Sequence, residues 1–309
     1  MALSVKDFIS IKDITRQDFE TLFARTDEMI ECVRRGEKPL EGESVVVATL
    51  FFEPSTRTRL SFETAAQRLG ARVINFASVE ASSMAKGETF SDTIRIVDGY
   101  ADLLVIRHPL EGSARLAAYI ADSPVINAGD GGNQHPTQTL LDLYTIRRLK
   151  GRIEGLNVFL LGDLKHARTM RSLLYGLGMF GANATLVAPK GLNMDRAVIE
   201  EVREKFGIEV VEKDKADLSD CDVLYVCRIQ KERFFDKYEA EKLQKEFRVS
   251  GEMLASAKDD MIILHPLPKI DEIEPSVDSS KFAKYFEQAK YGVPTRMALI
   301  CELIGKGGA

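Results

Sequence analysis

Short apolar runs alternate with helical patterns along nearly the whole chain. The runs are rich in β-branched residues, and most are continuously apolar, which is typical of parallel strands covered on both faces. The predicted strands are Ser44–Phe52, Arg72–Phe76, Leu103–Arg107, Val125–Asn127, Asn157–Leu161, Ala184–Val187, Glu209–Val211, Val223–Val226 and Met261–Leu264. The predicted helices are Leu60–Leu69, Thr89–Tyr100, Gly112–Ala121, Pro136–Lys150, Ala167–Phe180, Asp195–Phe206 and Tyr238–Phe247. This α/β pattern places the loops that follow the strands on a common edge, because crossover connections are right-handed.

The pattern divides near the middle of the chain. A polar stretch at Lys150–Gly155 interrupts it directly after a long helix, and a length of 309 residues is more typical of two domains than of one core. We therefore predict two doubly wound domains, each with a central parallel sheet flanked by helices. The first comprises residues 1–135 with a C-terminal helix at about 290–309, whose amphipathic part is Thr295–Ile304. The second comprises residues 136–289.

Composition and charge argue against several classes of protein. Hydrophobic residues make up 45% and charged residues 29% of the chain, and its net charge of −5 disfavours a general nucleic-acid binder, which needs a basic excess. No apolar run approaches the roughly 20 residues of a membrane span, and the charged N-terminal stretch lacks the apolar region of a signal peptide. The four cysteines form no Cys-x-x-Cys pair, so we expect reduced thiols in a cytoplasmic protein and no metal site.

The most informative residues follow the first predicted strand. Ser55–Arg59 reads Ser-Thr-Arg-Thr-Arg, and a helix that begins there directs free backbone N–H groups and the positive end of its dipole at the loop. The hydroxyls of Ser55, Thr56 and Thr58 can complete a cradle for a phosphate dianion together with the guanidinium of Arg57. A capped helix with surface arginines is the alternative, but it does not explain this density of hydroxyl and cationic groups. We therefore predict phosphate binding.

Other predicted strands also lead into cationic or amide side chains. Arg107 ends the third strand, and a glycine-rich stretch after the fourth leads to His135 and Gln138, which can face one ligand across the first turn of a helix. In the second half, Arg168 and Arg228 each follow a strand, and two cations suit a ligand with two carboxylates. The sequence thus predicts one anion site in each half.

Two further stretches bear on function. Pro266 and Pro268 lack backbone donors, so the loop after the last predicted strand offers carbonyl groups to a ligand. Gly176–Gly181 matches the Gly-x-Gly-x-x-Gly fingerprint of dinucleotide-binding proteins, but it ends a predicted helix rather than following a strand, so we expect no nicotinamide cofactor. Three cations remain open between ligand contact and a salt-bridged interface: Lys165, Lys231 and Arg233.

Taken in order, these motifs resemble the aspartate and ornithine carbamoyltransferase family over roughly residues 44–300. Ser55–Arg59 resembles the family's carbamoyl-phosphate signature. The other matching segments are Arg107–Pro109, His135–Gln138, Gly162–Lys165 and His265–Pro268. Arg228–Arg233 resembles the motif of the aspartate-specific members, and His-Pro-Leu-Pro stands where ornithine-specific members carry His-Cys-Leu-Pro. The ornithine-side Ser-Met-Gly element is missing from the second half.

The resemblance implies a reaction and a division of labour. Aspartate-specific members transfer the carbamoyl group of carbamoyl phosphate to the amino group of L-aspartate, which gives N-carbamoyl-L-aspartate and phosphate, the committed step of pyrimidine (UMP) biosynthesis. The first domain would bind carbamoyl phosphate and the second L-aspartate, with the active site in the cleft between them. We expect no cofactor, because carbamoyl phosphate is already an activated acyl donor.

By match of position, the resemblance also implies roles for single residues. The carbonyl oxygen would contact Arg107, His135 and Thr58, and the carbamoyl NH2 group would contact Gln138. The residues implied to bind carbamoyl phosphate are Ser55, Thr56, Arg57, Thr58, Arg107, His135, Gln138, Pro266, Leu267 and Pro268. Those implied to bind L-aspartate are Lys86, Arg168, Arg228 and Gln230. Those implied to be catalytic are Arg57, Thr58, Lys86, Arg107 and His135. Glu53 resembles the carboxylate that braces the arginines of the second domain.

Residues 82–88 resemble a loop that a neighbouring subunit lends to the active site. Ser82 and Lys86 keep the family register, so the resemblance implies a homotrimer with shared active sites, to which regulatory chains can add a larger assembly. The chain departs from the family's frequent residues at Met84-Ala85 and at His166, where tyrosine is frequent. It departs again at Lys269, which cannot reproduce a bidentate guanidinium.

Two alternatives compete with this interpretation. A carbamoyltransferase for a cationic amine such as ornithine would need carboxylates where Arg228 stands. A non-catalytic protein that binds phosphoanions or acts as a scaffold would not need His135, Gln138 and Lys86 in addition to the phosphate cradle.

Overall fold

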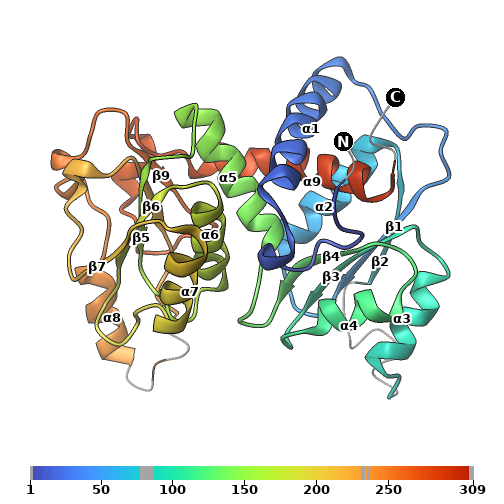
Figure 1. Ribbon diagram of the computed structural model, residues 1–309, viewed down its shortest axis with the longest axis horizontal. Coiled ribbons are helices and arrows are strands. Elements are labelled where there is room, and N and C mark those ends of the chain that lie inside the picture. The colour runs from blue at the N-terminus through green and yellow to red at the C-terminus, as the bar shows by residue number, and fades with distance from the viewer. Residues whose placement is uncertain (1–2, 77–86, 231–233, 235–236, 306–309) are drawn as a thin grey trace. The chain divides into compact units, whose positions relative to one another are not determined.

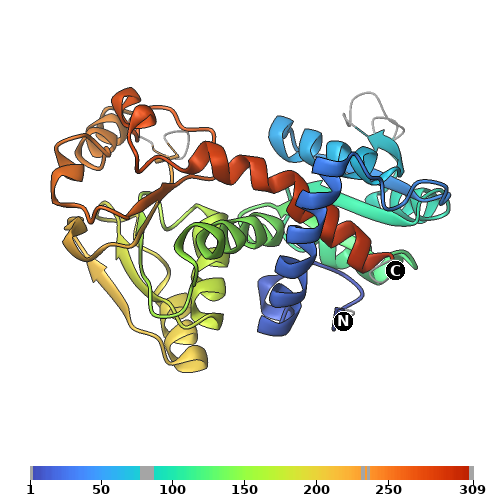
Figure 2. The same ribbon diagram turned by 90° about the horizontal axis from the view of Figure 1, so that it is seen from above.

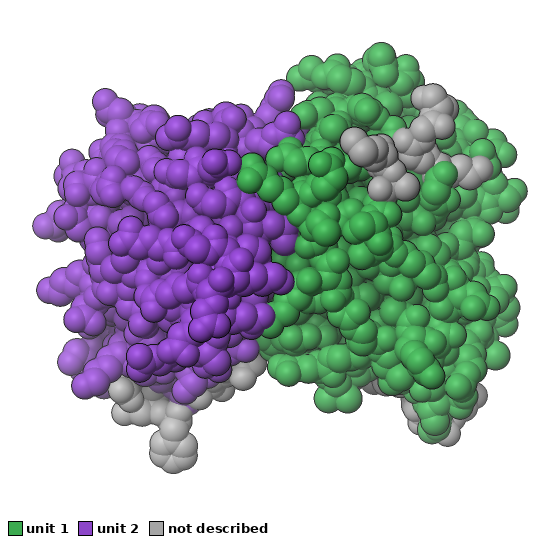
Figure 3. All heavy atoms as spheres, in the orientation of Figure 1, with its two compact units in different colours: residues 1–141, 291–309 green, residues 142–290 purple. Residues whose placement is uncertain are grey.

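The computed structural model describes residues 3–76, 87–230, 234 and 237–305. The chain forms two compact units, one of Met1–Leu141 with Tyr291–Ala309 and the other of Asp142–Lys290 (Figure 3). Both divisions fall inside helices, namely α5 (Pro136–Lys150) and α9 (Tyr285–Leu303), which Figures 1 and 2 show as continuous ribbons. We call the two parts unit 1 and unit 2.

Unit 1 contains a parallel sheet with the strand order β2-β1-β3-β4. Its strands are β1 (Val46–Phe51), β2 (Arg72–Phe76), β3 (Leu103–His108) and β4 (Val125–Asp130). Phe51 pairs with Arg107, and His108 pairs with Asp130, so β1, β3 and β4 end at the same edge. The strand order reverses between β1 and β3, and ligands of open α/β sheets bind at such a switch point.

Helices cover both faces of this sheet (Figure 1). They are α1 (Arg16–Arg35), α2 (Thr56–Leu69), α3 (Phe90–Asp98) and α4 (Ser113–Ile120). Ala48 and Leu50 of β1 share a buried cluster with Ile94 of α3 and residues of α4. Thr49 points to the opposite face, where its Oγ1 lies 3.4 Å from Glu63 of α2. The alternation follows from the two-residue period of a strand, and it explains why β1 is almost continuously buried.

Unit 2 contains a second parallel sheet, with the order β7-β6-β5-β8-β9. Its strands are β5 (Asn157–Leu161), β6 (Asn183–Val187), β7 (Val210–Lys213), β8 (Val223–Val226) and β9 (Ile262–Leu264). Its other helices are α6 (Arg168–Met179), α7 (Arg196–Phe206) and α8 (Lys237–Glu246). Phe159 and Leu161 face a core that includes Tyr285. The order reverses between β5 and β8, which is the switch point of this unit.

The predicted fold class is confirmed, and each predicted strand corresponds to an observed one. The helix limits differ more. α2 begins at Thr56 instead of Leu60, and α9 begins at Tyr285, a few residues before the start predicted near residue 290. The long helix α1 was absent from the prediction. Short 3₁₀ helices occur at Ile11–Asp13, Leu218–Asp220, Met253–Ser256 and Pro275–Ser279.

Candidate functional site

The switch point of unit 1 holds the start of α2. Ser55 occupies the N-cap position with extended dihedral angles, but its side chain makes no capping hydrogen bond, contrary to the role expected for a capping serine. Its carbonyl accepts the Arg59 amide at 3.3 Å. Thr56 and Arg57 are exposed on the first turn, and Thr58 is buried. The hydroxyls therefore sit beside the backbone N–H groups that a helix start leaves without intrahelical partners.

Arg57 is a cation that no carboxylate of the described residues compensates. No carboxylate lies within ion-pair distance of it in the part of the chain that the structure describes, and partial burial lowers the pKa of its guanidinium. The side chain also stands in the first turn of α2, where the helix dipole disfavours positive charge. A bound dianion would relieve both unfavourable interactions, so the electrostatics of this position favour a phosphate group.

Arg107 is held at the same edge by contacts within unit 1. Its Nε lies 3.3 Å from Oε2 of Glu53, and its Nη1 donates a hydrogen bond of 3.2 Å to the carbonyl of Ala128. Glu53, for which the resemblance implies contacts with arginines of the second domain, thus lies beside Arg107 of its own unit. The neighbouring His108 is a structural residue, because its Nδ1 accepts from the Leu110 amide at 3.0 Å and burial lowers its pKa.

Asp130 shapes the glycine-rich turn that leads to α5. Its carboxylate accepts hydrogen bonds from the amides of Gly112 and Gln134 and from the side chains of Asn127 and Asn133, at 2.8–3.2 Å. His135 follows this turn, and its carbonyl accepts the Gln138 amide at 3.0 Å. Both side chains are buried, and Pro136 is the first residue of α5 as predicted. Sequence reasoning missed Asp130, although its place at the end of a buried strand was a signal.

At the switch point of unit 2, the loops after β5 and β8 touch. Gly162 has φ +127°, and a Cβ atom there would lie 2.2 Å from the Cys227 carbonyl oxygen, so only glycine fits. Asp163 is fully buried and accepts hydrogen bonds from the Gln230 amide at 3.3 Å and from the amide and Nδ1 of His166 at 3.0 Å. The buried carboxylate thus joins the two loops.

The predicted aspartate-side residues stand on these joined loops. Arg168 is the first residue of α6, and Arg228 and Gln230 follow β8. All three side chains are half-buried. The switch point therefore gathers two guanidinium groups and an amide at one edge of the sheet, as the sequence predicted for a dicarboxylate.

The loop after β9 is the third element at this edge. His265 is buried, and its Nδ1 accepts the Leu267 amide at 2.8 Å. Leu267 has φ 56° in the left-handed region, and the Leu267–Pro268 peptide is cis. Lys269 stands where arginine is frequent in the family. Its Nζ forms an ion pair with Oδ2 of Asp278 in the same unit, at 3.0 Å.

Several predicted residues lie outside the described residues. These are Ser82, Met84, Ala85, Lys86, Lys231 and Arg233. The Gly176–Gly181 segment lies at the end of α6 and leads into β6, so it lacks the strand-to-helix context of a dinucleotide site. Instead, a Cβ atom on Gly178 would meet the Phe206 ring at 2.6 Å, which indicates close packing of α6 on α7.

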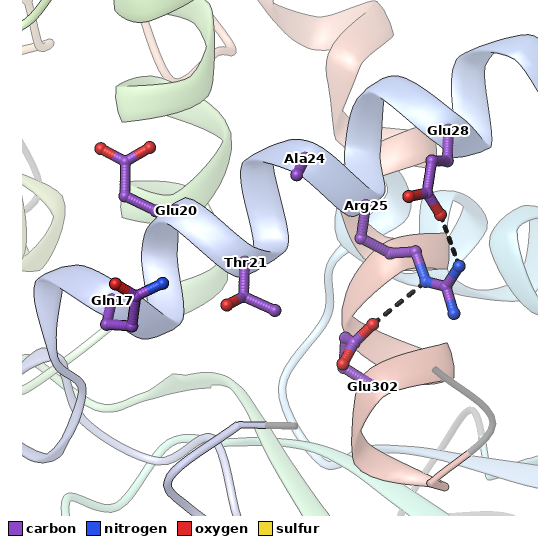
Figure 4. A pocket seen from close by; sticks show the side chains of 7 residues that line it. All are labelled: Gln17, Glu20, Thr21, Ala24, Arg25, Glu28 and Glu302. Carbon is purple, nitrogen blue, oxygen red and sulfur yellow. Dashed lines mark hydrogen bonds and ion pairs between the residues drawn. The ribbon is translucent and has the colours of Figure 1, made fainter. Parts of the chain in front are cut away.

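A separate hollow of about 240 Å³ lies between α1 and α9 in unit 1 (Figure 4). Arg25 bridges Glu28 and Glu302 there, with an Nε-to-Oε1 distance of 3.0 Å to Glu302. Glu20 adds a third carboxylate to the lining. The excess of negative charge makes this hollow unsuitable for the phosphate predicted from the sequence, and it contains none of the predicted site residues.

Three properties of the described residues bear on other functions. No group of three His, Cys, Asp or Glu side chains there is arranged to hold a metal ion. No described helix has both the length and the apolar character that crossing a membrane requires. Cys221, Cys227 and Cys301 are buried free thiols, and burial raises the pKa of each, to about 12 for Cys301, which makes them poor nucleophiles.

Comparisons with known proteins agree with the motif analysis. Residues 6–148 match the family model of the aspartate/ornithine carbamoyltransferase carbamoyl-P binding domain, and residues 154–303 match that of the Asp/Orn binding domain. The aspartate carbamoyltransferase catalytic subunit of Archaeoglobus fulgidus is 52% identical over 97% of this chain and 99% of its own length. That of Methanopyrus kandleri is 51% identical over 98% of both chains.

Solved structures give the same picture. The catalytic subunit of M. jannaschii aspartate transcarbamoylase superposes with a TM-score of 0.91 and 48% identity, covering 98% of this chain and 99% of that one. The Trypanosoma cruzi enzyme in complex with N-(phosphonacetyl)-L-aspartic acid has a TM-score of 0.90 at 38% identity, covering 96% and 95%. Sequence motifs, sheet topology and these comparisons together establish that the chain belongs to the aspartate/ornithine carbamoyltransferase family.

Proposed function

We propose that this chain transfers the carbamoyl group of carbamoyl phosphate to the amino group of L-aspartate through residues at its two switch points. The products are N-carbamoyl-L-aspartate and phosphate, and the reaction is the committed step of pyrimidine biosynthesis. The observation that carries the proposal is the start of α2, where Arg57 has no carboxylate partner among the described residues. Relatives about 50% identical to nearly the whole chain carry the name of this enzyme.

On the side of unit 1, the phosphate group lies at the start of α2. Its oxygens accept hydrogen bonds from the helix N–H groups and from the side chains of Ser55, Thr56, Arg57 and Thr58. The carbonyl oxygen lies against Thr58, Arg107 and His135, and the carbamoyl NH2 group lies against Gln138. The position of Arg107 supports its assigned contact with the carbonyl oxygen, because Glu53 and the Ala128 carbonyl hold its guanidinium at the sheet edge.

On the side of unit 2, the two carboxylates of L-aspartate bind to Arg168 and Arg228, with Gln230 beside them. The carbonyl groups of Pro266 and Leu267, next to Pro268, also accept from the carbamoyl NH2 group. The junction at Asp163 supports this assignment, because it holds the loops that carry these side chains together.

The chemistry needs little beyond these groups. The carbamoyl carbon is already activated, so the protein has to hold the amine against it and stabilise the oxyanion of the tetrahedral intermediate. Loss of one donor to that oxygen costs about 3–4 kcal/mol of activation free energy. The departing phosphate accepts the proton that the amine releases, and Arg57 neutralises its remaining charge.

The working enzyme is a cytoplasmic homotrimer in this proposal, and Ser82 and Lys86 of a neighbouring subunit complete each site. Unit 1 offers surface for such contacts, since Ile96 and Tyr100 are 54% and 65% exposed. Regulatory chains extend the assembly where they are present. Names of relatives as catalytic subunits support an oligomer in general terms.

A coupled assay of phosphate release tests the function. The purified chain is given carbamoyl phosphate with L-aspartate, with L-ornithine or with no amine. We expect release with L-aspartate alone. Equal release with ornithine would point to a different amine specificity, and binding of carbamoyl phosphate without any release would favour a non-catalytic phosphoanion-binding protein.

A further inference from the structure

A buried polar network lies behind the Pro266–Pro268 loop of unit 2. His265, Glu272, Gln288 and Asp142 are each at most 3% exposed, and hydrogen bonds join them in a continuous chain. None of these four side chains was assigned a role in binding or catalysis above. Burial of a charged group costs folding free energy unless the group is fully paired. We therefore expect this network to have a structural or functional role.

The first part of the network fixes the His265 ring. Nδ1 accepts the Leu267 amide proton at 2.8 Å, so the ring proton belongs on Nε2, which lies 2.8 Å from Oε1 of Glu272. The other Glu272 oxygen accepts from the amides of Ile270 and Asp271, both at 3.1 Å. Burial opposes ionisation of Glu272, but the His265 hydrogen bond and the backbone amides lower its pKa. The carboxylate therefore sets both the tautomer and the orientation of the ring.

The second part fixes the backbone of His265. The His265 amide donates to Oε1 of Gln288 at 2.8 Å, and Nε2 of Gln288 donates to Oδ1 of Asp142 at 2.6 Å. Oδ2 of Asp142 accepts from the hydroxyl of Tyr225 at 2.7 Å. The network thus ties the end of β9 to α5, to β8 and to α9.

The held segment has an unusual backbone. Leu267 adopts φ 56°, a left-handed conformation that a leucine side chain disfavours by roughly 1–2 kcal/mol. A backbone of this kind persists only where its surroundings impose it. The hydrogen bond from the Leu267 amide to Nδ1 of His265 holds this conformation in place. A change in the backbone angles of Leu267 would change the directions of the Pro266 and Leu267 carbonyl groups.

We propose that His265 is a positioning residue, held by Glu272 and Gln288, that fixes the direction of the Pro266 and Leu267 carbonyl groups toward the carbamoyl NH2 group. The inference rests on the proposed function. It predicts that His265 acts on carbamoyl phosphate through the NH2 end of that substrate and leaves recognition of the phosphate group at α2 unchanged.

Two variants separate the two ring hydrogen bonds. In His265→Asn, the side-chain oxygen stands where Nδ1 stood and can still accept the Leu267 amide, while the bond to Glu272 is lost. In His265→Gln, the amide group reaches toward Glu272, while the acceptor for Leu267 is lost. Each variant breaks one buried hydrogen bond to a charged or backbone group, so both lower the melting temperature.

Kinetic measurements then distinguish a positioning role of His265 from a role in folding stability alone. We expect His265→Gln to lower kcat/KM for carbamoyl phosphate about tenfold or more, the size of one lost hydrogen bond to a fixed group. The inhibition constant of inorganic phosphate stays within about twofold in both variants, because phosphate contacts α2 alone. His265→Asn keeps most of the activity. A parallel measurement on the unchanged chain tests the proposed function by itself.

The outcomes are separable. Equal kinetic losses in both variants, a matching loss of phosphate binding, or unchanged kinetics with a lower melting temperature would each overturn the positioning role. Absence of carbamoyl transfer in the unchanged chain would instead reject the proposed function. If a His265 variant is insoluble, Glu272→Gln takes its place, since the amide NH2 group of glutamine cannot accept a hydrogen bond and either His265 Nε2 or the Ile270 and Asp271 amides lose their acceptor. Because that variant keeps the acceptor for the Leu267 amide, as His265→Asn does, a loss of about tenfold in kcat/KM for carbamoyl phosphate in it would also overturn the proposal.

Discussion

Replacing Arg57 by alanine should separate function from stability at the start of α2. The side chain is exposed, it has no ion-pair partner among the described residues, and it stands in the first turn of a helix, where the dipole disfavours a cation. Removal of the charge therefore costs the fold nothing. We expect the free energy of unfolding to change by less than about 0.5 kcal/mol, and any change to be toward greater stability.

The effect on catalysis should be far larger. The planar guanidinium can donate two charge-assisted hydrogen bonds to the phosphate group, and its charge is most useful when the leaving phosphate gains negative charge. A loss of about 3–4 kcal/mol of transition-state stabilisation corresponds to roughly two to three orders of magnitude in kcat/KM. Few substitutions combine such a loss of activity with unchanged stability.

The assay measures phosphate release at saturating L-aspartate together with thermal unfolding, with and without inorganic phosphate. Phosphate should raise the melting temperature of the unchanged chain by mass action and should have little effect on Arg57→Ala. Arg68→Ala is the matched control, because Arg68 is an exposed arginine in the last turn of the same helix. Near-normal kcat/KM in Arg57→Ala, or a loss shared equally by Arg68→Ala, would refute the assignment of the phosphate cradle.

Three further predictions concern other parts of the chain. Arg228→Ala should raise the KM for L-aspartate about tenfold or more and leave that for carbamoyl phosphate nearly unchanged, which initial-rate kinetics would check; equal weakening of both substrates would contradict the division between units. Lys86→Ala and Arg57→Ala chains should each be almost inactive but regain part of the activity when mixed subunits exchange within a trimer, and a mixture that has exchanged yet stays inactive would reject the shared site. Burial opposes ionisation of Asp18, but hydrogen bonds from Ser4 and Thr15 lower its pKa. Its stabilising contribution is therefore present above about pH 4 and is lost as the pH falls through the lowered pKa. Asp18→Asn should remove this part of the acid dependence in unfolding titrations, and an unchanged titration curve would contradict it.

The central strands were predictable because they are buried on both faces, whereas the edge strands β2 and β7 are partly exposed. In β5, the four residues after Asn157 are all apolar and buried, so their composition indicates a central parallel strand. α1 was missed although its buried apolar residues Phe19, Leu22, Phe23 and Met29 recur at helical spacing. Its ends carried a usable signal, since Thr15 and Asp18 form a capping box and Gly36 closes the helix in a left-handed conformation.

Pro294 lies inside α9, and the helix predicted at about 290–309 also includes it. A proline inside a helix costs about 3 kcal/mol, which favours a boundary at that position when only local sequence is considered. In the fold, buried residues such as Met297 and Leu299 follow the proline and Tyr285 precedes it, so tertiary packing outweighs the local cost. No pattern of nearby residues reports such a balance.

The cationic side chains at the switch points were predictable from the sequence, whereas the buried carboxylates that position the surrounding loops were not. Arg57, Arg107 and Arg228 could be found because strand ends meet at one edge of a parallel sheet, a rule that needs no coordinates. The carboxylates of Asp130 and Glu272 act through partners that the chain brings together only on folding. Hydrogen bonds between side chains and loop amides leave no periodic trace in the sequence, so sequence reasoning did not pair them even where the partners lie a few residues apart.

The two switch points differ in how they maintain their charge, and the difference has a consequence for stability. In unit 2, the buried carboxylate of Asp163 accepts hydrogen bonds from backbone amides of both loops and so stabilises their arrangement. In unit 1, the exposed cation at the start of α2 has no such compensation in the described residues. A ligand that neutralises such a cation binds the folded chain and so raises its stability by mass action. Inorganic phosphate should therefore raise the melting temperature of the unchanged chain through the site in unit 1, and an unchanged melting temperature at saturating phosphate would contradict this reasoning.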